Sequence, residues 1–123
     1  KKIKRQPRPA LHLQRARMYM AMGKPEKARS DLDYCISQGT PDARMYINRA
    51  STHFPADLEG VIADCNKAVA LNPKLKNAYF LRGLAFSGLG NQEAACKDFS
   101  KAIALGFTAL RKAEKKRCKE FWD

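Results

Sequence analysis

The stretch NAYFLRGLAFSGLGNQEAACKDFSKAIALG, residues 77–106, alternates small and bulky side chains at helical spacing. The small residues, which leave room for a neighbouring helix to approach, are Gly83, Gly90, Ala95 and Ala102. The bulky residues between them are Tyr79, Phe86, Phe99 and Leu105. Apolar residues that recur with a period of about 3.6 predict amphipathic helices. We therefore expect this stretch to form two helices that pack face to face around a turn.

The same arrangement recurs twice upstream. Aligning the segments that begin at Arg8 and Asp42 with the stretch above brings QRA, NRA and LRG into register. Arg15, Arg49 and Arg82 then stand 34 and 33 residues apart, and a small residue follows each of them. A fixed period of this length is the signature of a repeat architecture. The chain is therefore expected to contain three repeats of one unit.

Each unit predicts two amphipathic helices separated by turn residues. We place helices near residues 10–22, 25–37, 42–54, 57–71, 75–88, 91–104 and 108–121. Pro25 and Asn91 are suited to open a helix after a glycine turn, and Pro73 ends one. The chain then divides into a basic N-terminal arm or end of a preceding segment (1–9), three units (10–41, 42–74 and 75–107, together 10–107) and a basic capping helix (108–123).

These units resemble the tetratricopeptide repeat family, whose helix-turn-helix unit of about 34 residues is built on such positions. The third unit carries the family pattern at Tyr79, Gly83, Phe86, Gly90, Ala95, Phe99 and Ala102, and the second at Tyr46, Ala50, Ala68 and Pro73. The first departs from it, with His12 at an aromatic position and Cys35 at an alanine position. The resemblance covers about residues 9–107. It implies an all-α fold: a right-handed α-solenoid superhelix of three repeats, closed by a capping helix.

Charge is concentrated at the two ends of the sequence. The chain has 24 Lys and Arg against 12 Asp and Glu, a net charge of +12, and strongly basic domains often bind nucleic acid. Residues 1–17 hold seven basic residues and no acid, whereas the ninety residues between the ends carry a net charge of only +2. A basic groove built by the repeats is therefore not indicated. Nucleic-acid or anionic-surface binding through the basic N- and C-terminal ends is the alternative function.

The four cysteines predict two buried thiols and one candidate pair. Cys35 and Cys65 fall at inward helix positions, where a free thiol behaves as a small hydrophobe. Cys96 and Cys118 lie on the last repeat helix and the cap, where an exported chain could join them in a disulfide. A zinc site is not favoured, because His12 and His53 occupy aromatic positions of the repeat and lack ligand spacing. No metal or cofactor is expected.

No catalytic motif is present in the sequence. There is no nucleophile elbow, no phosphate-binding glycine loop and no His-Asp-Ser or Cys-His grouping that the helices would bring together. An aspartate also recurs in each unit, and we assign it a structural role. Asp31, Asp64 and Asp98 follow the three repeat arginines by sixteen, fifteen and sixteen residues. Each Arg-Asp pair can meet across its own hairpin and orient the two helices. We expect no enzyme, and an ion pair in every unit.

The family resemblance implies a concave face lined by the first helix of each unit, which receives a peptide or helix of a partner. The lining then comprises Leu13, Arg17, Met20, Arg44, Ile47, Asn48, Ser51, Phe54, Asn77, Phe80 and Leu84. This is an apolar strip edged by basic and amide groups. We expect a non-catalytic protein-interaction scaffold that binds a protein or peptide partner through this strip.

Some relatives hold the C-terminal carboxylate of a chaperone with a clamp of Lys, Asn and Arg side chains. Asn48 matches one element of that clamp. The other clamp positions hold Leu13, Arg17, Asn77 and Leu81, so the sequence argues against chaperone-tail binding.

The N-terminus does not assign a compartment. The sequence begins with Lys1 and has no apolar signal core, as expected of a mature chain or an excised fragment. The run ACKDFSKAIALGF before a basic helix resembles the C-terminal ends of bacterial envelope-associated repeat proteins, which leaves the bacterial cell envelope and the cytoplasm both open. No apolar run approaches the ~20 residues of a membrane-spanning helix.

Overall fold

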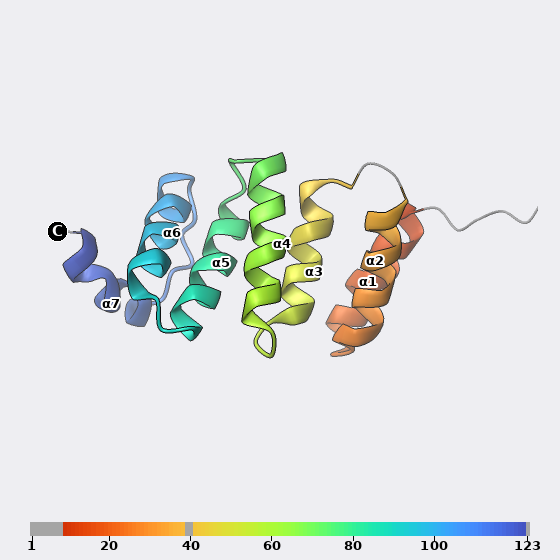
Figure 1. Ribbon diagram of the computed structural model, residues 1–123, viewed down its shortest axis with the longest axis horizontal. Coiled ribbons are helices and arrows are strands. Elements are labelled where there is room, and N and C mark those ends of the chain that lie inside the picture. Colours follow the sequence, from red (N-terminus) through yellow and green to blue (C-terminus); the bar gives the residue numbers. More distant parts are fainter. Residues whose placement is uncertain (1–8, 39–40, 123) are drawn as a thin grey trace, which may run out of the picture.

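The computed structural model describes residues 9–38 and 41–122, and within these ranges the chain forms seven helices and no strand. The helices are α1 (Pro9–Ala21), α2 (Pro25–Ser37), α3 (Ala43–His53), α4 (Leu58–Leu71), α5 (Lys76–Gly88), α6 (Gln92–Ala104) and α7 (Lys112–Trp122). Figure 1 shows them side by side in one row, with α1 and α2 at one end and α7 at the other. The predicted all-α repeat solenoid is confirmed. The expected N-terminal arm, residues 1–9, falls almost entirely outside the described residues.

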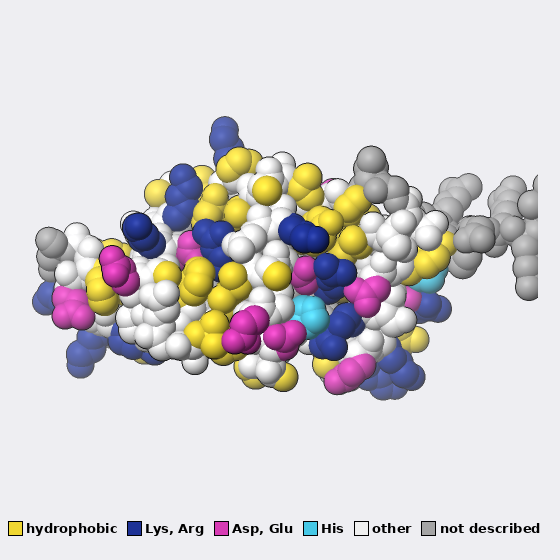
Figure 2. All heavy atoms as spheres, in the orientation of Figure 1, with side chains coloured by type: hydrophobic (Ala, Val, Ile, Leu, Met, Phe, Trp, Pro, Cys, Tyr) yellow, Lys and Arg dark blue, Asp and Glu magenta, His cyan; other side chains and the backbone are white. Residues whose placement is uncertain are grey.

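Each helix contacts the next along the chain, and the first helices of successive hairpins also touch: α1 contacts α3, and α3 contacts α5. The first helices therefore form one layer of the row. In Figure 2 acidic and basic side chains are intermixed over the middle of the molecule. Within the described residues no helix has the length and apolar character needed to cross a bilayer.

Turn and capping residues fix where the helices begin. The side chains of Asp42, Asp57 and Asn91 accept hydrogen bonds from backbone N–H groups three residues later, at 3.1, 3.0 and 3.1 Å. These residues lie outside the helices as N-caps, so α3, α4 and α6 start one residue later than the sequence predicted. Gly23 and Gly90 adopt positive φ angles of 74° and 85°, the conformation that a tight turn between helices requires.

Small residues stand where two helices touch, as the sequence predicted. Ala16 and Ala50 are buried at the centres of the first two hairpins. Gly83 is their counterpart in the third, where a Cβ atom would lie only 2.6 Å from the ring of Phe99. The small positions thus allow close helix packing, and the bulky residues fill the core beside them.

The C-terminal helix begins later than predicted. We expected a helix over residues 108–121, but α7 starts at Lys112. The connection before it has no regular secondary structure, and from it the ring of Phe107 stacks on that of Phe80 with centroids 4.3 Å apart. Leu110 is buried in the same cluster. Packing of these two apolar side chains outweighs continuation of the helix.

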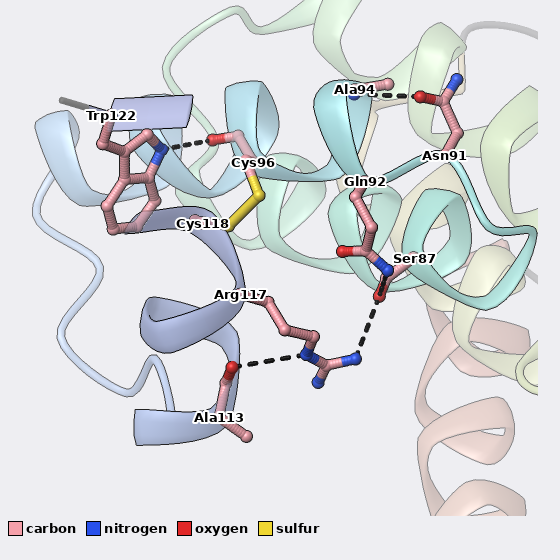
Figure 3. Close-up of a disulfide and its surroundings, with 9 residues drawn as sticks. All are labelled: Ser87, Asn91, Gln92, Ala94, Cys96, Ala113, Arg117, Cys118 and Trp122. Carbon is pink, nitrogen blue, oxygen red and sulfur yellow. Dashed lines mark hydrogen bonds between the residues drawn. A yellow bond between two sulfur atoms is a disulfide. The ribbon is translucent and has the colours of Figure 1, made fainter. Parts of the chain in front are cut away.

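Several contacts hold α7 against the last repeat. Cys96 and Cys118 form a disulfide, and the indole Nε1 of Trp122 donates a hydrogen bond to the carbonyl oxygen of Cys96 at 3.0 Å (Figure 3). Arg117 reaches Ser87 of α5 at 3.4 Å. The structure thus joins the cysteine pair that the sequence singled out. The cap is tied to both helices of the third hairpin.

One residue of the cap is buried against expectation. Ala113 is exposed, whereas the acidic side chain of Glu114 beside it is buried. Burial has the largest single effect and would raise the pKa of Glu114, but the hydrogen bonds from Arg111 and the backbone, together with the charges of Arg111 and Arg117, lower the pKa below the usual value. The Glu114 carboxylate is therefore ionised although it is buried, and it belongs to a helix that is rich in basic residues.

Candidate peptide-binding surface

An Arg-Asp ion pair orients the two helices of each hairpin. Nε and Nη2 of Arg15 donate to the carboxylate of Asp31 at 2.9 and 2.6 Å. The equivalent bonds join Arg49 to Asp64 at 3.0 and 2.8 Å, and Arg82 to Asp98 at 2.8 and 2.7 Å. All three predicted pairs are confirmed. Each is bidentate, which fixes both the register and the direction of the side chains.

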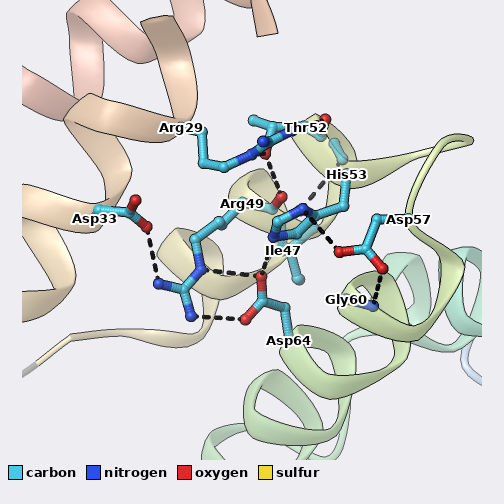
Figure 4. Close-up of polar contacts among 10 residues, drawn as sticks. Arg29, Asp33, Ile47, Arg49, Thr52, His53, Asp57, Gly60 and Asp64 are labelled. Atoms are coloured by element: carbon cyan, nitrogen blue, oxygen red, sulfur yellow. Dashed lines mark hydrogen bonds and ion pairs between the residues drawn. The ribbon is translucent and has the colours of Figure 1, made fainter. Parts of the chain in front are cut away.

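These arginines also join neighbouring hairpins. Arg49 Nη1 donates to Asp33 of α2 at 3.0 Å, and Arg82 Nη1 donates to Asn66 of α4 at 2.9 Å. Figure 4 shows Arg49 between the two carboxylates, one from its own hairpin and one from the preceding one. Sequence reasoning missed these bonds, although the signal was present, because Asp33 and Asn66 both stand 16 residues before their arginines.

His53 lies among acidic side chains at the base of the second hairpin. Its ring nitrogens are 3.6 Å from Asp57 and 3.7 Å from Asp64 (Figure 4). Among the described residues, no three His, Cys, Asp or Glu side chains are placed to hold a metal ion.

A hollow of about 210 Å³ lies between α1 and α3, where the first two hairpins meet. It is lined by Ala16, Arg17, Met20, Leu32, Asn48 and Ser51. Four of these, Arg17, Met20, Asn48 and Ser51, belong to the predicted lining. Its floor is apolar, since Ala16 and Leu32 are core residues and Met20 packs beside them. The first two units thus supply a shallow site with an apolar base and a polar rim.

The remaining predicted lining residues lie elsewhere. Phe80 and Leu84 pack on the C-terminal cluster around Phe99. Leu13 and Ile47 pack on the cores of the first and second hairpins. Phe54 and Asn77 are exposed outside the hollow. The structure therefore brings together Arg17, Met20, Asn48 and Ser51, and it packs the aliphatic and aromatic members Leu13, Ile47, Phe80 and Leu84 against the cores.

Arg44 lines a second hollow, of about 400 Å³, near the start of α3. Its other lining residues are Asp42, Ala43, Leu71, Asn72 and Leu75. Arg44 pairs there with Asp42 at 3.3 Å, so its charge is partly matched within the chain. This hollow includes the connection between α4 and α5 and is separate from the one between α1 and α3.

Comparisons with known proteins agree with this architecture. A family model described as Tetratricopeptide repeat matches residues 77–105. The first TPR of Spaghetti (RPAP3) bound to HSP90 peptide SRMEEVD is 24% identical, with a TM-score of 0.84, and the match covers 94% of each chain. The second TPR of Spaghetti, bound to the same peptide, is 26% identical with a TM-score of 0.76 and covers 79% of this chain and 91% of that chain. Residues 77–105 therefore match a tetratricopeptide repeat, and the three hairpins together have the tetratricopeptide repeat fold.

Other comparisons extend the same result. The Arabidopsis OM64 TPR domain is 23% identical, with a TM-score of 0.81, and the match covers 93% of each chain. A search of curated proteins found no match in sequence. The tetratricopeptide repeat assignment thus rests on the third hairpin, which matches in sequence, and on the arrangement of all three hairpins.

The positions that correspond to the carboxylate clamp can now be placed in this fold. Leu13 packs on the core of the first hairpin, and Leu81 packs on the core around Ala50 and Val61. Both are aliphatic side chains at positions where a clamp needs basic ones. Arg17 and Asn48, in contrast, line the same hollow. The polar groups that could meet a carboxylate are therefore these two side chains.

Proposed function

We propose that the chain is a non-catalytic protein-interaction module that binds a peptide of a partner at the hollow between α1 and α3. The observation that carries the proposal is that Arg17, Met20, Asn48 and Ser51, from two different repeats, line one open site. Support also comes from the structural neighbours, two of which are TPR domains bound to the HSP90 peptide SRMEEVD.

The chemistry of the hollow defines the peptide. Its floor of Ala16, Met20 and Leu32 accepts one aliphatic side chain. Within the described residues, neither Arg17 nor Asn48 makes a side-chain hydrogen bond, unlike the repeat arginines, so both are available to a ligand. A guanidinium and an amide at the rim favour a carboxylate or backbone carbonyls beside the anchoring side chain. The expected ligand is a short segment with an aliphatic anchor next to an acidic group.

A chaperone tail such as SRMEEVD is not the expected ligand. The clamp positions carry Leu13 and Leu81 in place of basic side chains, so only part of the charge that would meet two carboxylates is present. We expect SRMEEVD to bind more weakly than a peptide selected for this site.

Peptide selection followed by affinity measurement tests the proposal. A library of short peptides with free carboxyl termini is selected on the immobilised chain, and the enriched peptide is titrated by fluorescence anisotropy. Arg17→Ala and Asn48→Ala should each weaken its binding about tenfold or more, the loss expected for a hydrogen bond to a charged group. Lys97→Ala, which removes an exposed charge from α6, should leave the affinity unchanged.

Two outcomes would contradict the proposal. The first is an enriched peptide that binds the Arg17→Ala and Asn48→Ala variants as tightly as the parent chain. The second is selection that enriches nothing while generic RNA binds with a steep dependence on salt, which would favour recognition through the basic ends.

A further inference from the structure

The outer face of α1 corresponds, position by position, to faces that are covered in the other hairpins. In the register set by Arg15, Arg49 and Arg82, the residue Leu11 corresponds to Met45 and Ala78, and Met18 corresponds to Thr52 and Ala85. We call Leu11, Arg15 and Met18 the N-terminal stacking face. Its counterparts on α3 and α5 show what such a face contacts.

The counterparts pack on the second helix of the preceding hairpin. Ala85 of α5 belongs to a core cluster with Val61 and Cys65 of α4. Arg49 and Arg82 each extend Nη1 to the preceding hairpin, where a carboxylate or an amide oxygen accepts the hydrogen bond at 3.0 and 2.9 Å. Stacking of α5 on α4 therefore uses an apolar contact and a bond to the repeat arginine. Between α2 and α3 the bond to the repeat arginine recurs, and Thr52 accepts hydrogen bonds from Arg29 at 3.1 and 2.8 Å in place of the apolar contact.

The apolar members of the stacking face are exposed. Met18 is 63% exposed, whereas its counterparts Thr52 and Ala85 are 4% and 0% exposed. Leu11 is 58% exposed, whereas Ala78 is fully buried. A large apolar side chain therefore projects into solvent at two positions that the other repeats bury or, at Met45, half-bury.

The repeat arginine follows the same pattern. The side chain of Arg15 is 56% exposed, against 20% for Arg49 and 19% for Arg82. All three arginines hold the aspartate of their own hairpin. Among the described residues, Arg15 has no counterpart of the bonds to Asp33 and Asn66, so the Nη1 group that makes them in the other repeats is free.

Among the described side chains of α1, the exposed large apolar residues, Leu11 and Met18, both lie at the stacking positions. Met22, in the turn after α1, is also exposed, but its counterpart Leu89 is 46% exposed as well, so that position faces solvent in both repeats. At the other end of the row, the lysines of α7 are exposed, and so are the rings of Phe121 and Trp122 at its last turn, at 43% and 36%. Terminal units of repeat proteins need a polar outer face, and the α1 end lacks one over Leu11 and Met18.

We propose that the N-terminal stacking face receives a helical hairpin of the same repeat type that lies outside residues 1–123. The second helix of that hairpin packs on α1 as α2 packs on α3, with an apolar surface over Leu11 and Met18 and a carboxylate or amide oxygen bonded to Arg15. This is continuous with the interfaces already formed between the three hairpins.

Charge argues against a second copy of the chain as the occupant. Stacking a copy head to tail would place α7, with Lys112, Lys115 and Lys119, against Arg15. Pairing two α1 faces would bring two copies of Arg15 together. Both arrangements set like charges at the position where the internal interfaces set an acceptor.

Extending the chain tests the proposal. In one variant, residues 8–41 are repeated once before Arg8, which places the added Asp33 16 residues before Arg15, the separation seen for Arg49. In a second variant, residues 42–74 are inserted there instead and present the added Asn66 to Arg15. Each variant is unfolded with urea beside the chain of residues 1–123.

We expect Met18→Lys to lower the folding equilibrium constant at least about tenfold in an extended variant, where the lysine must be buried. The same substitution should change it less than about twofold in the chain of residues 1–123. Met22→Lys is the matched control and should be tolerated in both, because its position stays exposed.

The proposal is overturned if Met18→Lys has the same effect in the extended and parent chains, or if neither extended variant unfolds as one cooperative unit. It is also overturned if the methyl resonance of Met18 shifts with concentration in the parent chain while a dimer forms in ultracentrifugation. That result would make a second copy the occupant.

Discussion

At the residue scale, the side chains of this protein are ordered by the repeat register. The ion pairs of Asp31, Asp64 and Asp98 could be predicted because each arginine and aspartate recur with the period of the units. The burial of Glu114 could not be predicted from the sequence, because a helix with many lysines indicates a face exposed to solvent. The pairing of Glu114 with Arg111 also depends on the path of the connection before α7.

Asp31 should contribute to stability only where its carboxylate is ionised. The hydrogen bond from Arg15 holds the pKa of Asp31 below its usual value, and His12 bonds the same group at 3.0 Å. With a folded pKa below the unfolded value of about 3.9, the stabilisation is present above that pH and is lost as pH falls through the folded pKa. Asp31→Asn should therefore destabilise the chain at pH 7.

The pH series provides the check. The difference in the free energy of unfolding between the parent chain and Asp31→Asn should shrink as the pH is lowered below about 4. Glu120→Gln, at an exposed position, is the control. A difference that stays constant from pH 7 to pH 2 would contradict the role assigned to the Arg15 pair.

Gly83 should tolerate no larger residue. Alanine improves helix propensity by about 1 kcal/mol, but overpacking a core costs about 1–3 kcal/mol. The added Cβ would lie 2.6 Å from the Phe99 ring, so we expect a net loss of up to about 2 kcal/mol in urea unfolding. The loss should be smaller when Phe99→Leu removes the ring. Stabilisation by Gly83→Ala alone would contradict this packing.

At the element scale, the helices and the turns between them could be predicted from the sequence, whereas the start of the C-terminal helix α7 could not. Proline, glycine and capping residues define the hairpins directly, so α1 to α6 lie within two residues of their predicted bounds. The start of α7 depends on where Phe107 and Leu110 find apolar partners in the third hairpin. That is a tertiary contact with no local signal, and it is also why Phe80 is covered rather than exposed.

The Cys96–Cys118 disulfide should set the stability of the cap. It closes a loop with a sequence separation of 22 residues, and bridges over loops of this size typically contribute about 2–4 kcal/mol. Replacing both cysteines by alanine should lower stability by that amount and accelerate amide hydrogen exchange in α7, with α1 to α4 little changed. Reduction of the parent chain with dithiothreitol should reproduce the effect.

Cysteine labelling gives an independent check on the same bridge. Cys35 and Cys65 are buried, and burial raises the pKa of Cys65 to about 12, so neither thiol should react in the folded chain. Denaturation without reductant should expose two thiols, and reduction should expose four. Exchange in α7 that is unaffected by loss of the bridge would show that the other contacts of Trp122 and Arg117 suffice.

At the whole-molecule scale, the three hairpins form a row whose two ends differ. The C-terminal end is covered by α7, while the α1 end leaves Leu11 and Met18 in solvent. Between the ends, the layer of first helices offers the hollow between α1 and α3. The sequence could predict which helices form this layer, but which of its side chains stay open depends on how the hairpins and the cap pack together.

The four methionines of the chain allow the most direct test of peptide binding at the hollow. Met20 lines it, whereas Met18 is exposed on α1, Met22 is exposed in the turn after α1, and Met45 lies near the start of α3. Titration of ¹³C-methyl-methionine protein with the selected peptide should shift the Met20 resonance and leave the other three in place. A shift of Met18 or Met45 with Met20 unmoved would contradict the account, because the peptide would then bind outside the hollow between α1 and α3.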